Sequence, residues 1–149
     1  MRSVRGEIAS RFFGAPSERM LVVAVTGTNG KTSCCHFIAQ ALNASGHRCG
    51  VMGTLGYGMP GKVKKPGLTT PGAIDLQRRL AELLYEGASG VALEASSHGL
   101  AQQRLAGTAI DIAVFTEHDP GSPRLSRDFC RIQSLQNRNS LNGKDSGRR

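Results

Sequence analysis

The residues most able to do chemistry form a glycine-rich segment that carries a lysine and several hydroxyl groups. It lies between an apolar run and a helical pattern, and it consists of Gly27, Thr28, Asn29, Gly30, Lys31, Thr32 and Ser33. Such a loop turns successive backbone N–H groups toward one point, and the N-terminus of the following helix adds a positive dipole end. The pattern predicts a phosphate-binding loop, with Lys31 at the terminal phosphates of a nucleotide and the Thr32 hydroxyl on Mg²⁺.

The spacing of this loop departs from the general phosphate-loop pattern. That pattern places a glycine five positions before Gly30, where this chain has Val25. An ordinary turn between a strand and a helix, with a lysine on the surface, is the alternative interpretation. We favour the phosphate loop because the apolar run, the glycines, the Lys-Thr pair and the helical pattern occur together.

A second group of polar residues follows another apolar run. Glu94 ends the run 90–94, and a carboxylate at a strand end is a hard oxygen ligand suited to Mg²⁺. His98 alone would more often be structural, but its place beside Glu94 favours a ligand role. The planar guanidinium of Arg104 suits an anionic substrate. The alternatives are a solvated or helix-capping Glu94 and an Arg104 on a solvated helix face.

The apolar pattern alternates between strands and helices. It predicts strands at 20–25, 49–54 and 90–94, a final buried strand at 110–116, and helices at 31–44 and from 71 to about 86. Thr70 is the expected N-cap of the second helix, with Pro71 in its first turn. This alternation implies a parallel sheet with helices on its faces and ligands at the carboxyl ends of the strands. The expected fold class is therefore α/β, a Rossmann-like P-loop domain with a mostly parallel sheet.

Composition excludes several other classes of protein. The formal net charge is +8, but the basic residues are scattered and form no helical stripe, so no nucleic-acid partner is expected. The four cysteines lack the CxxC spacing of zinc or redox sites. The longest apolar run, 20–25, is too short to span a bilayer, and charged residues interrupt the N-terminus. We expect a soluble, cytoplasmic protein.

Three segments together resemble the Mur ligases. Residues 25–32, Val-Thr-Gly-Thr-Asn-Gly-Lys-Thr, are similar to the ATP loop of that family. Residues 69–71, Thr-Thr-Pro, and residues 94–100, Glu-Ala-Ser-Ser-His-Gly-Leu, resemble the member that adds the third residue to UDP-N-acetylmuramoyl-L-alanyl-D-glutamate. The resemblance covers about residues 8–116. Together, the motifs distinguish this member from the other Mur ligases and from folylpolyglutamate synthases.

The resemblance implies a role for each matching residue. Residues 27–33 would hold the phosphates of ATP, and Thr32, Glu94 and His98 would hold Mg²⁺. Lys31, Glu94 and His98 would be catalytic. The residues implied for binding the UDP-MurNAc-dipeptide are Thr69, Thr70, Ser96, Gln102 and Arg104.

The resemblance also implies the reaction. ATP would phosphorylate the D-glutamyl carboxylate, and the amino group of an incoming amino acid would displace phosphate from the acyl phosphate and form an amide. That amino acid is expected to be meso-diaminopimelate, with lysine as the alternative. A monomer is expected.

The same resemblance predicts how the chain is divided. Residues 1–19 would be the remnant of a linker, 20–116 part of the central ATP-binding domain, and 117–149 a disordered tail. The family also has an N-terminal domain for the uridine nucleotide and a C-terminal domain for the amino acid. We expect both to be missing and this truncated chain to be inactive alone. A non-catalytic ATP-binding remnant and a folylpolyglutamate-synthase-like ligase are the rival interpretations.

A change of reading frame would account for the tail. After Phe115-Thr116 the family continues with Asn and then Asp-His-Leu-Asp, whereas this chain continues Glu117-His118-Asp119. With permitted codons for residues 117–136, a shift of one base reads Asn-Met-Thr-Arg-Asp-His-Leu-Asp-Phe-His-Gly-Thr-Phe-Ala-Glu-Tyr-Lys. This string is family-like, and it predicts that residues 117–149 are frameshifted translation.

Overall fold

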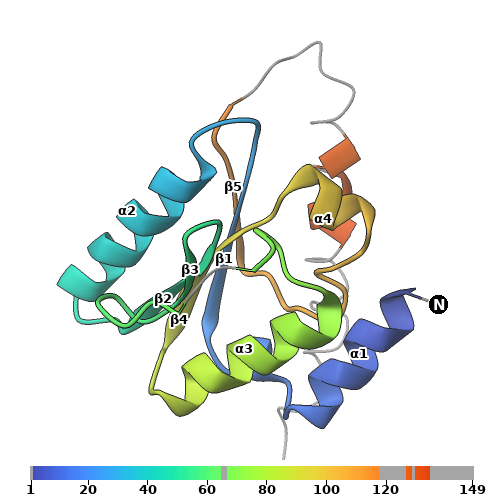
Figure 1. Ribbon diagram of the computed structural model, residues 1–149, viewed down its shortest axis with the longest axis horizontal. Coiled ribbons are helices and arrows are strands. Elements are labelled where there is room, and N and C mark those ends of the chain that lie inside the picture. Colours follow the sequence, from blue (N-terminus) through green and yellow to red (C-terminus); the bar gives the residue numbers. More distant parts are fainter. Residues whose placement is uncertain (1, 65–66, 118–126, 129, 135–149) are drawn as a thin grey trace, which may run out of the picture.

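A computed structural model describes residues 2–64, 67–117, 127–128 and 130–134. Helices and strands alternate through most of this length (Figure 1). In chain order the elements are α1 (Arg2–Phe12), η1 (Pro16–Glu18), β1 (Leu21–Thr26), α2 (Lys31–Ala44), β2 (Cys49–Gly53), β3 (Gly56–Gly58), α3 (Ala73–Tyr85), β4 (Gly90–Glu94), α4 (Ser97–Ala101) and β5 (Ile112–Phe115).

The strands form one five-stranded sheet in the order β3-β2-β4-β1-β5. All neighbours pair in parallel except β3, which forms an antiparallel hairpin with β2. Val25 of β1 pairs with Glu94 of β4, and Thr26 pairs with Phe115 of β5. The predicted α/β class with a mostly parallel sheet is therefore confirmed.

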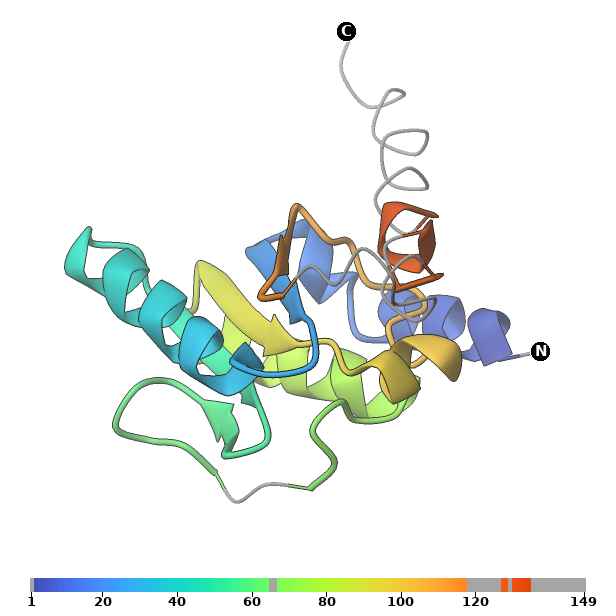
Figure 2. The same ribbon diagram turned by 90° about the horizontal axis from the view of Figure 1, so that it is seen from above.

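Helices cover both faces of the sheet. Helix α2 lies on one face, while α3 and α1 lie on the other, as two views of the ribbon show (Figures 1 and 2). Leu76, Leu80 and Leu83 repeat at helical spacing along α3, and each is at most 1% exposed. Burying one such side chain contributes about 1.5–3 kcal/mol. The smaller Cys35 and Ala39 form the buried side of α2.

Helix α3 begins later than the sequence predicted. It starts at Ala73 with Gly72 as its N-cap, and no side chain caps it. The prediction that Thr70 is the N-cap is wrong, because its hydroxyl instead donates to the main-chain oxygen of Glu94 at 2.8 Å. The Thr70 hydroxyl thus bonds to the end of the distant strand β4, and it does not cap the helix that follows.

Strand β5 lies at the edge of the sheet. It pairs with β1 on one side, and Ile112 at its start is 47% exposed. The sequence predicted a buried strand over 110–116, and the observed strand is shorter and only partly covered. An apolar run has the same pattern whether its strand is central or at an edge, so the sequence alone does not separate the two.

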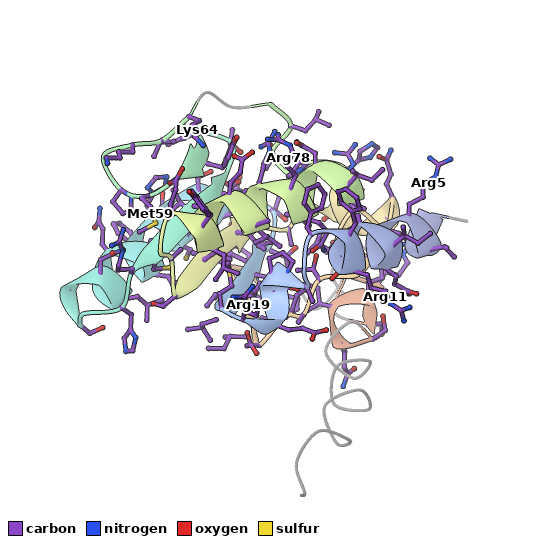
Figure 3. The ribbon with its side chains drawn as sticks, turned by 90° about the horizontal axis from the view of Figure 1, so that it is seen from below. Arg5, Arg11, Arg19, Met59, Lys64 and Arg78 are labelled. Carbon is purple, nitrogen blue, oxygen red and sulfur yellow. The ribbon has the colours of Figure 1, made fainter. Side chains whose placement is uncertain are left out.

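The segment after β3 is fastened to α3 by a charged cluster. The Tyr57 hydroxyl donates to Glu82 Oε2 at 3.0 Å, and Lys64 Nζ lies 3.3 Å from Glu82 and 3.2 Å from Glu86. The Arg79 guanidinium lies 4.4 Å from the centre of the Tyr57 ring. Figure 3 shows Lys64 on the same side of the molecule as Arg78, which also pairs with Glu82. These contacts hold β3 and Lys64 against α3.

Part of the segment after Thr116 is ordered against the domain. Residues 127–128 and 130–134 are helical, and Ile132 is 1% exposed within the main core cluster. These few residues differ from the disorder expected for 117–149, because an apolar side chain finds cover on the α3 side of the sheet. The remaining residues of that range after Glu117 lie outside the described part. No helix among the described residues is long and apolar enough to cross a membrane.

Candidate functional site

Four parallel strands end at the same edge of the sheet. The residues that follow these ends are Gly27 after β1, Thr54 after β2, Ala95 and Ser96 after β4, and Thr116 after β5. In an open α/β sheet ligands bind outside such carboxyl ends. The fold thereby brings the predicted phosphate loop and the Glu94 segment to one place.

The glycine loop has the backbone that the sequence predicted. Gly27 has φ +137° and Gly30 has φ +77°, and L residues with a side chain rarely adopt either. A Cβ on Gly27 would lie 2.1 Å from Thr116 Oγ1. Gly30 is also the N-cap of α2, and no side chain caps this helix. The first N–H groups of a helix have no acceptor within it, so this end of α2 suits an anion.

Lys31 lies against the loop that it follows. Its Nζ donates to the main-chain oxygens of Gly27 at 2.8 Å and Thr28 at 3.0 Å. The ammonium group is thus placed beside the uncapped end of α2. Two positive features, the lysine and the helix dipole, act on the same small volume. This arrangement can bind and stabilise phosphate groups.

Glu94 is buried but its carboxylate is hydrogen-bonded. The residue is 3% exposed, and Oε1 accepts from the Thr54 N–H at 2.9 Å while Oε2 accepts from the Thr54 hydroxyl at 3.0 Å. A Cβ on Gly53 would lie 2.1 Å from Glu94 Oε1. The carboxylate therefore occupies space that only a glycine at position 53 leaves open.

A network of hydroxyl groups surrounds Glu94. Thr69 Oγ1 lies 3.1 Å from Thr54 Oγ1, and Thr70 Oγ1 lies 3.0 Å from Ser96 Oγ. Ser96 N–H donates to Thr70 Oγ1 at 3.0 Å, and Ser96 Oγ accepts from Gly99 N–H at 3.1 Å as the N-cap of α4. Thr70 is 1% exposed, so its hydroxyl serves to join β4 to the segment before α3.

Arg104, Gln102 and His98 form a second chain of side-chain bonds. Arg104 Nε and Nη2 donate to Gln102 Oε1 at 2.9 and 2.7 Å, and Nη1 donates to the Thr70 main-chain oxygen at 2.7 Å. Gln102 Nε2 lies 2.8 Å from His98 Nε2. An amide nitrogen only donates, so His98 Nε2 is the acceptor in this arrangement. The bonds of Arg104 go to neutral oxygens and leave its positive charge for an anionic group.

These residues fit a magnesium ion that is carried by phosphates. Among the described residues no three His, Cys, Asp or Glu side chains lie close enough to hold a metal. Mg²⁺ usually keeps several waters and takes one or two carboxylates together with substrate phosphates. The buried Glu94 carboxylate at the strand end supplies such a ligand. His98 is exposed and bonded to Gln102 instead.

Two of the residues that shape the site were missed from the sequence, and a third, Thr116, was expected only as a residue at the carboxyl end of a strand. Gly53 and Thr54 hold Glu94, and Thr116 donates through its hydroxyl to the Asn29 main-chain oxygen in the loop. The signal available was weak, since each is a small residue just after an apolar run. Burial raises the pKa of the nearby Cys35 thiol above its usual range, the Glu94 charge raises it further, and the Lys31 charge lowers it. Glu94 and Lys31 therefore both lie close enough to act on Cys35.

Known proteins share this sequence and fold. The chain is 54% identical over 123 residues to the UDP-N-acetylmuramoyl-L-alanyl-D-glutamate–2,6-diaminopimelate ligase of Coxiella burnetii (strain RSA 493 / Nine Mile phase I), covering 83% of this chain and 24% of that protein. It is 48% identical over 116 residues to the ligase of the same name from Nitrosomonas europaea (strain ATCC 19718 / CIP 103999 / KCTC 2705 / NBRC 14298), covering 78% and 22%. The chain thus spans about a quarter of the length of these relatives.

A solved structure and a family match agree with these relatives. A structure titled as a UDP-N-acetylmuramoyl-L-alanyl-D-glutamate–2,6-diaminopimelate ligase superposes with a TM-score of 0.75 at 31% identity, covering 96% of this chain and 34% of that one. The Mur ligase middle domain matches residues 25–120, which include the glycine loop, Glu94 and Arg104. The chain therefore belongs to the Mur ligase family, through its middle domain.

Proposed function

We propose that the chain supplies the ATP-binding part of a ligase that adds meso-diaminopimelate to UDP-MurNAc-L-Ala-D-Glu. The observation that carries the proposal is the glycine loop at the uncapped end of α2, next to the buried Glu94 carboxylate at the same edge of the sheet. The names of the relatives support the substrates and the peptidoglycan-precursor reaction. We also propose that the protein is cytoplasmic and monomeric.

Each proposed role follows from charge and position. Residues 27–33 bind the phosphates of ATP through backbone N–H groups, and Lys31 neutralises charge that develops on the transferred phosphate. Glu94 and Thr32 hold Mg²⁺, and His98 becomes a further ligand by exchanging its bond to Gln102 for the ion. The ion supplies charge neutralisation at the phosphates when it is bound.

The substrate carboxylate needs positive charge beside the loop. Arg104 supplies it, because Gln102 and the Thr70 main chain fix the guanidinium without neutralising it. Thr69, Thr70, Ser96 and Gln102 then position the dipeptide directly or through this network. Holding the D-glutamyl carboxylate in line with the transferred phosphate supplies the proximity that acyl-phosphate formation requires.

The 149 residues by themselves are proposed to bind ATP without ligation. The matched part of the chain covers 24% and 22% of the length of the two relatives, and we propose that the amino-acid site lies outside this part. The test is calorimetric titration with ATP and Mg²⁺, followed by an assay for product from ATP, UDP-MurNAc-L-Ala-D-Glu and diaminopimelate. ATP binding that Lys31→Ala abolishes supports the proposal. Product formed by the purified chain overturns the claim that it is inactive alone.

The two rivals give different results in the same assays. A non-catalytic nucleotide-binding remnant binds ATP but shows no competition or cooperativity with the UDP-MurNAc-dipeptide. A folylpolyglutamate-synthase-like ligase would respond to a folate in place of that dipeptide. We favour the Mur substrate because the Ser96-Ser97-His98 segment follows Glu94 and continues to Gln102 and Arg104.

We also propose that residues after Thr116 are read in a shifted frame. The family match ends at residue 120, and permitted codons allow a one-base shift to give a family-like string from residue 117. Sequencing the source DNA across the codon for Thr116 tests this. A one-base lesion with Asp-His-Leu-Asp in the alternate frame supports the proposal. An intact frame in independent isolates overturns it and makes the tail a genuine part of the protein.

A further inference from the structure

Thr54 holds the Glu94 carboxylate by both oxygens at once. Its N–H lies 2.9 Å from Oε1, and its hydroxyl lies 3.0 Å from Oε2. Two donors on one residue fix the plane of the carboxylate, because each oxygen is tied to a separate atom of the same short segment. A carboxylate held through one oxygen alone could still rotate about its terminal bond.

Gly53 leaves the space that these two hydrogen bonds from Thr54 to Glu94 require. A Cβ at that position would meet Glu94 Oε1 at 2.1 Å and the carboxyl carbon at 2.5 Å. The two adjacent residues thus have complementary parts, since the glycine leaves room for the carboxylate and the threonine supplies both donors. Forty positions separate Thr54 from Glu94, so the pairing exists only because β2 and β4 are neighbours in the sheet.

The held carboxylate is next to the nucleotide loop. Glu94 pairs in register with Val25, two positions before Gly27. Val25 also lies in one buried cluster with Cys35, which belongs to the helix that the loop begins. Each ionised carboxylate oxygen has two lone-pair sites, so Thr54 leaves one site free on each oxygen. Those free sites can take a metal ion.

We propose that Thr54 is the positioning residue for Glu94, orienting its carboxylate for a divalent cation that enters with the nucleotide. The proposal rests on the proposed function, in that the loop at residues 27–33 binds ATP. Hydrogen bonds that orient a metal ligand commonly change metal affinity by about 10- to 100-fold. Thr54 touches neither the metal nor the phosphates in this scheme, and it acts through Glu94.

The test compares ATP affinity with and without metal in the whole chain. Calorimetric titrations with ATP are run in Mn²⁺ and in EDTA for the wild type, Thr54→Val, Thr54→Ser and Ser45→Ala. Ser45 is a matched control, because its exposed hydroxyl bonds only within the end of α2. We expect Thr54→Val to lower the affinity in Mn²⁺ about tenfold and to leave the affinity in EDTA unchanged. Thr54→Ser keeps a hydroxyl donor at this position, so we expect its ATP affinities to equal those of the wild type.

The possible results distinguish a failure of this inference from a failure of the proposed function. A folded Thr54→Val chain whose ATP affinities in Mn²⁺ and in EDTA equal those of the wild type overturns the inference. The proposed ATP binding then still stands. Equal losses in Mn²⁺ and in EDTA also overturn it, because they show a general structural role. No ATP binding by the wild type under either condition overturns the proposed function and the inference with it.

A second measurement needs no variant and covers a failure of Thr54→Val to fold. Mn²⁺ broadens the NMR signals of nearby protons, and the Thr54 N–H is bonded directly to Glu94 Oε1. Substoichiometric Mn²⁺ with ATP should therefore broaden the Thr54 amide signal together with those of residues 27–33. The Ser45 amide at the other end of α2 should stay sharp. Broadening of the loop with a sharp Thr54 signal contradicts the proposal.

Discussion

Replacing Gly27 with alanine tests whether the glycine loop is locked against β5. The alanine would have to keep φ +137°, and its Cβ would lie 2.1 Å from Thr116 Oγ1. Backbone strain of this kind costs about 1–3 kcal/mol. Thr116 must also move, although its hydroxyl donates to the Asn29 main-chain oxygen and lies 3.4 Å from that of Thr26.

The expected loss of stability combines these two effects. The hydrogen bond of Thr116 to Asn29 contributes about 0.5–1.5 kcal/mol, so Gly27→Ala should lower the free energy of unfolding by about 1.5–4.5 kcal/mol in total. Urea denaturation followed by circular dichroism measures it. Gly46→Ala is the matched control, since Gly46 has φ +88° and nothing lies within 4 Å of an added Cβ. The control isolates backbone strain, about 1–2 kcal/mol.

A double-mutant cycle completes the test. Thr116→Ala removes the Oγ1 atom that a Cβ on Gly27 would meet, so the double variant should recover part of the loss caused by Gly27→Ala. The reasoning is refuted if Gly27→Ala costs no more than Gly46→Ala and if the two changes at 27 and 116 are additive. That result would mean that the loop moves freely relative to β5.

Further predictions concern the core, one cap and the thiols. Leu80→Ala should lower the free energy of unfolding by about 2–5 kcal/mol, measured in urea, because Leu80 is fully buried between α3 and the sheet. Ser96→Ala should cost about 0.5–2 kcal/mol in the same assay through loss of the α4 cap. Burial raises the pKa of Cys49 to about 11 and that of Cys35 further. At pH 8 iodoacetamide should therefore modify the exposed Cys130 and spare both buried thiols until urea is added, and peptide mapping that shows equal labelling would contradict this.

Local sequence patterns were enough to predict the regular elements near the loop. Helix α2 was predicted over 31–44 and spans Lys31–Ala44, because a glycine loop begins it and a Ser-Gly turn ends it. Strand β4 was likewise predicted over its full length, Gly90–Glu94. In both cases the signals that start and stop the element lie within a few residues of its ends.

Contacts between distant residues account for what the sequence did not reveal. Thr70 looked like a helix cap, but its hydroxyl bonds to Glu94, which is 24 positions away. Thr54 carried no local sign of its role, because its partner is 40 positions away. The edge position of β5 depends on the order of the strands, and an apolar run does not encode that order. The roles of the predicted substrate residues remain predictions.

In the hydroxyl network around Glu94, the donor and the acceptor of each hydrogen bond can be assigned. Thr54 has one hydroxyl hydrogen and gives it to Glu94, so Thr69 must be the donor in its contact with Thr54. Thr70 gives its hydrogen to the Glu94 main chain, so Ser96 must donate to Thr70. Every hydroxyl proton in the network therefore points inward. A bound molecule meets Thr69 as an acceptor only, which suits an N–H or O–H group, while its carboxylates are left to Arg104.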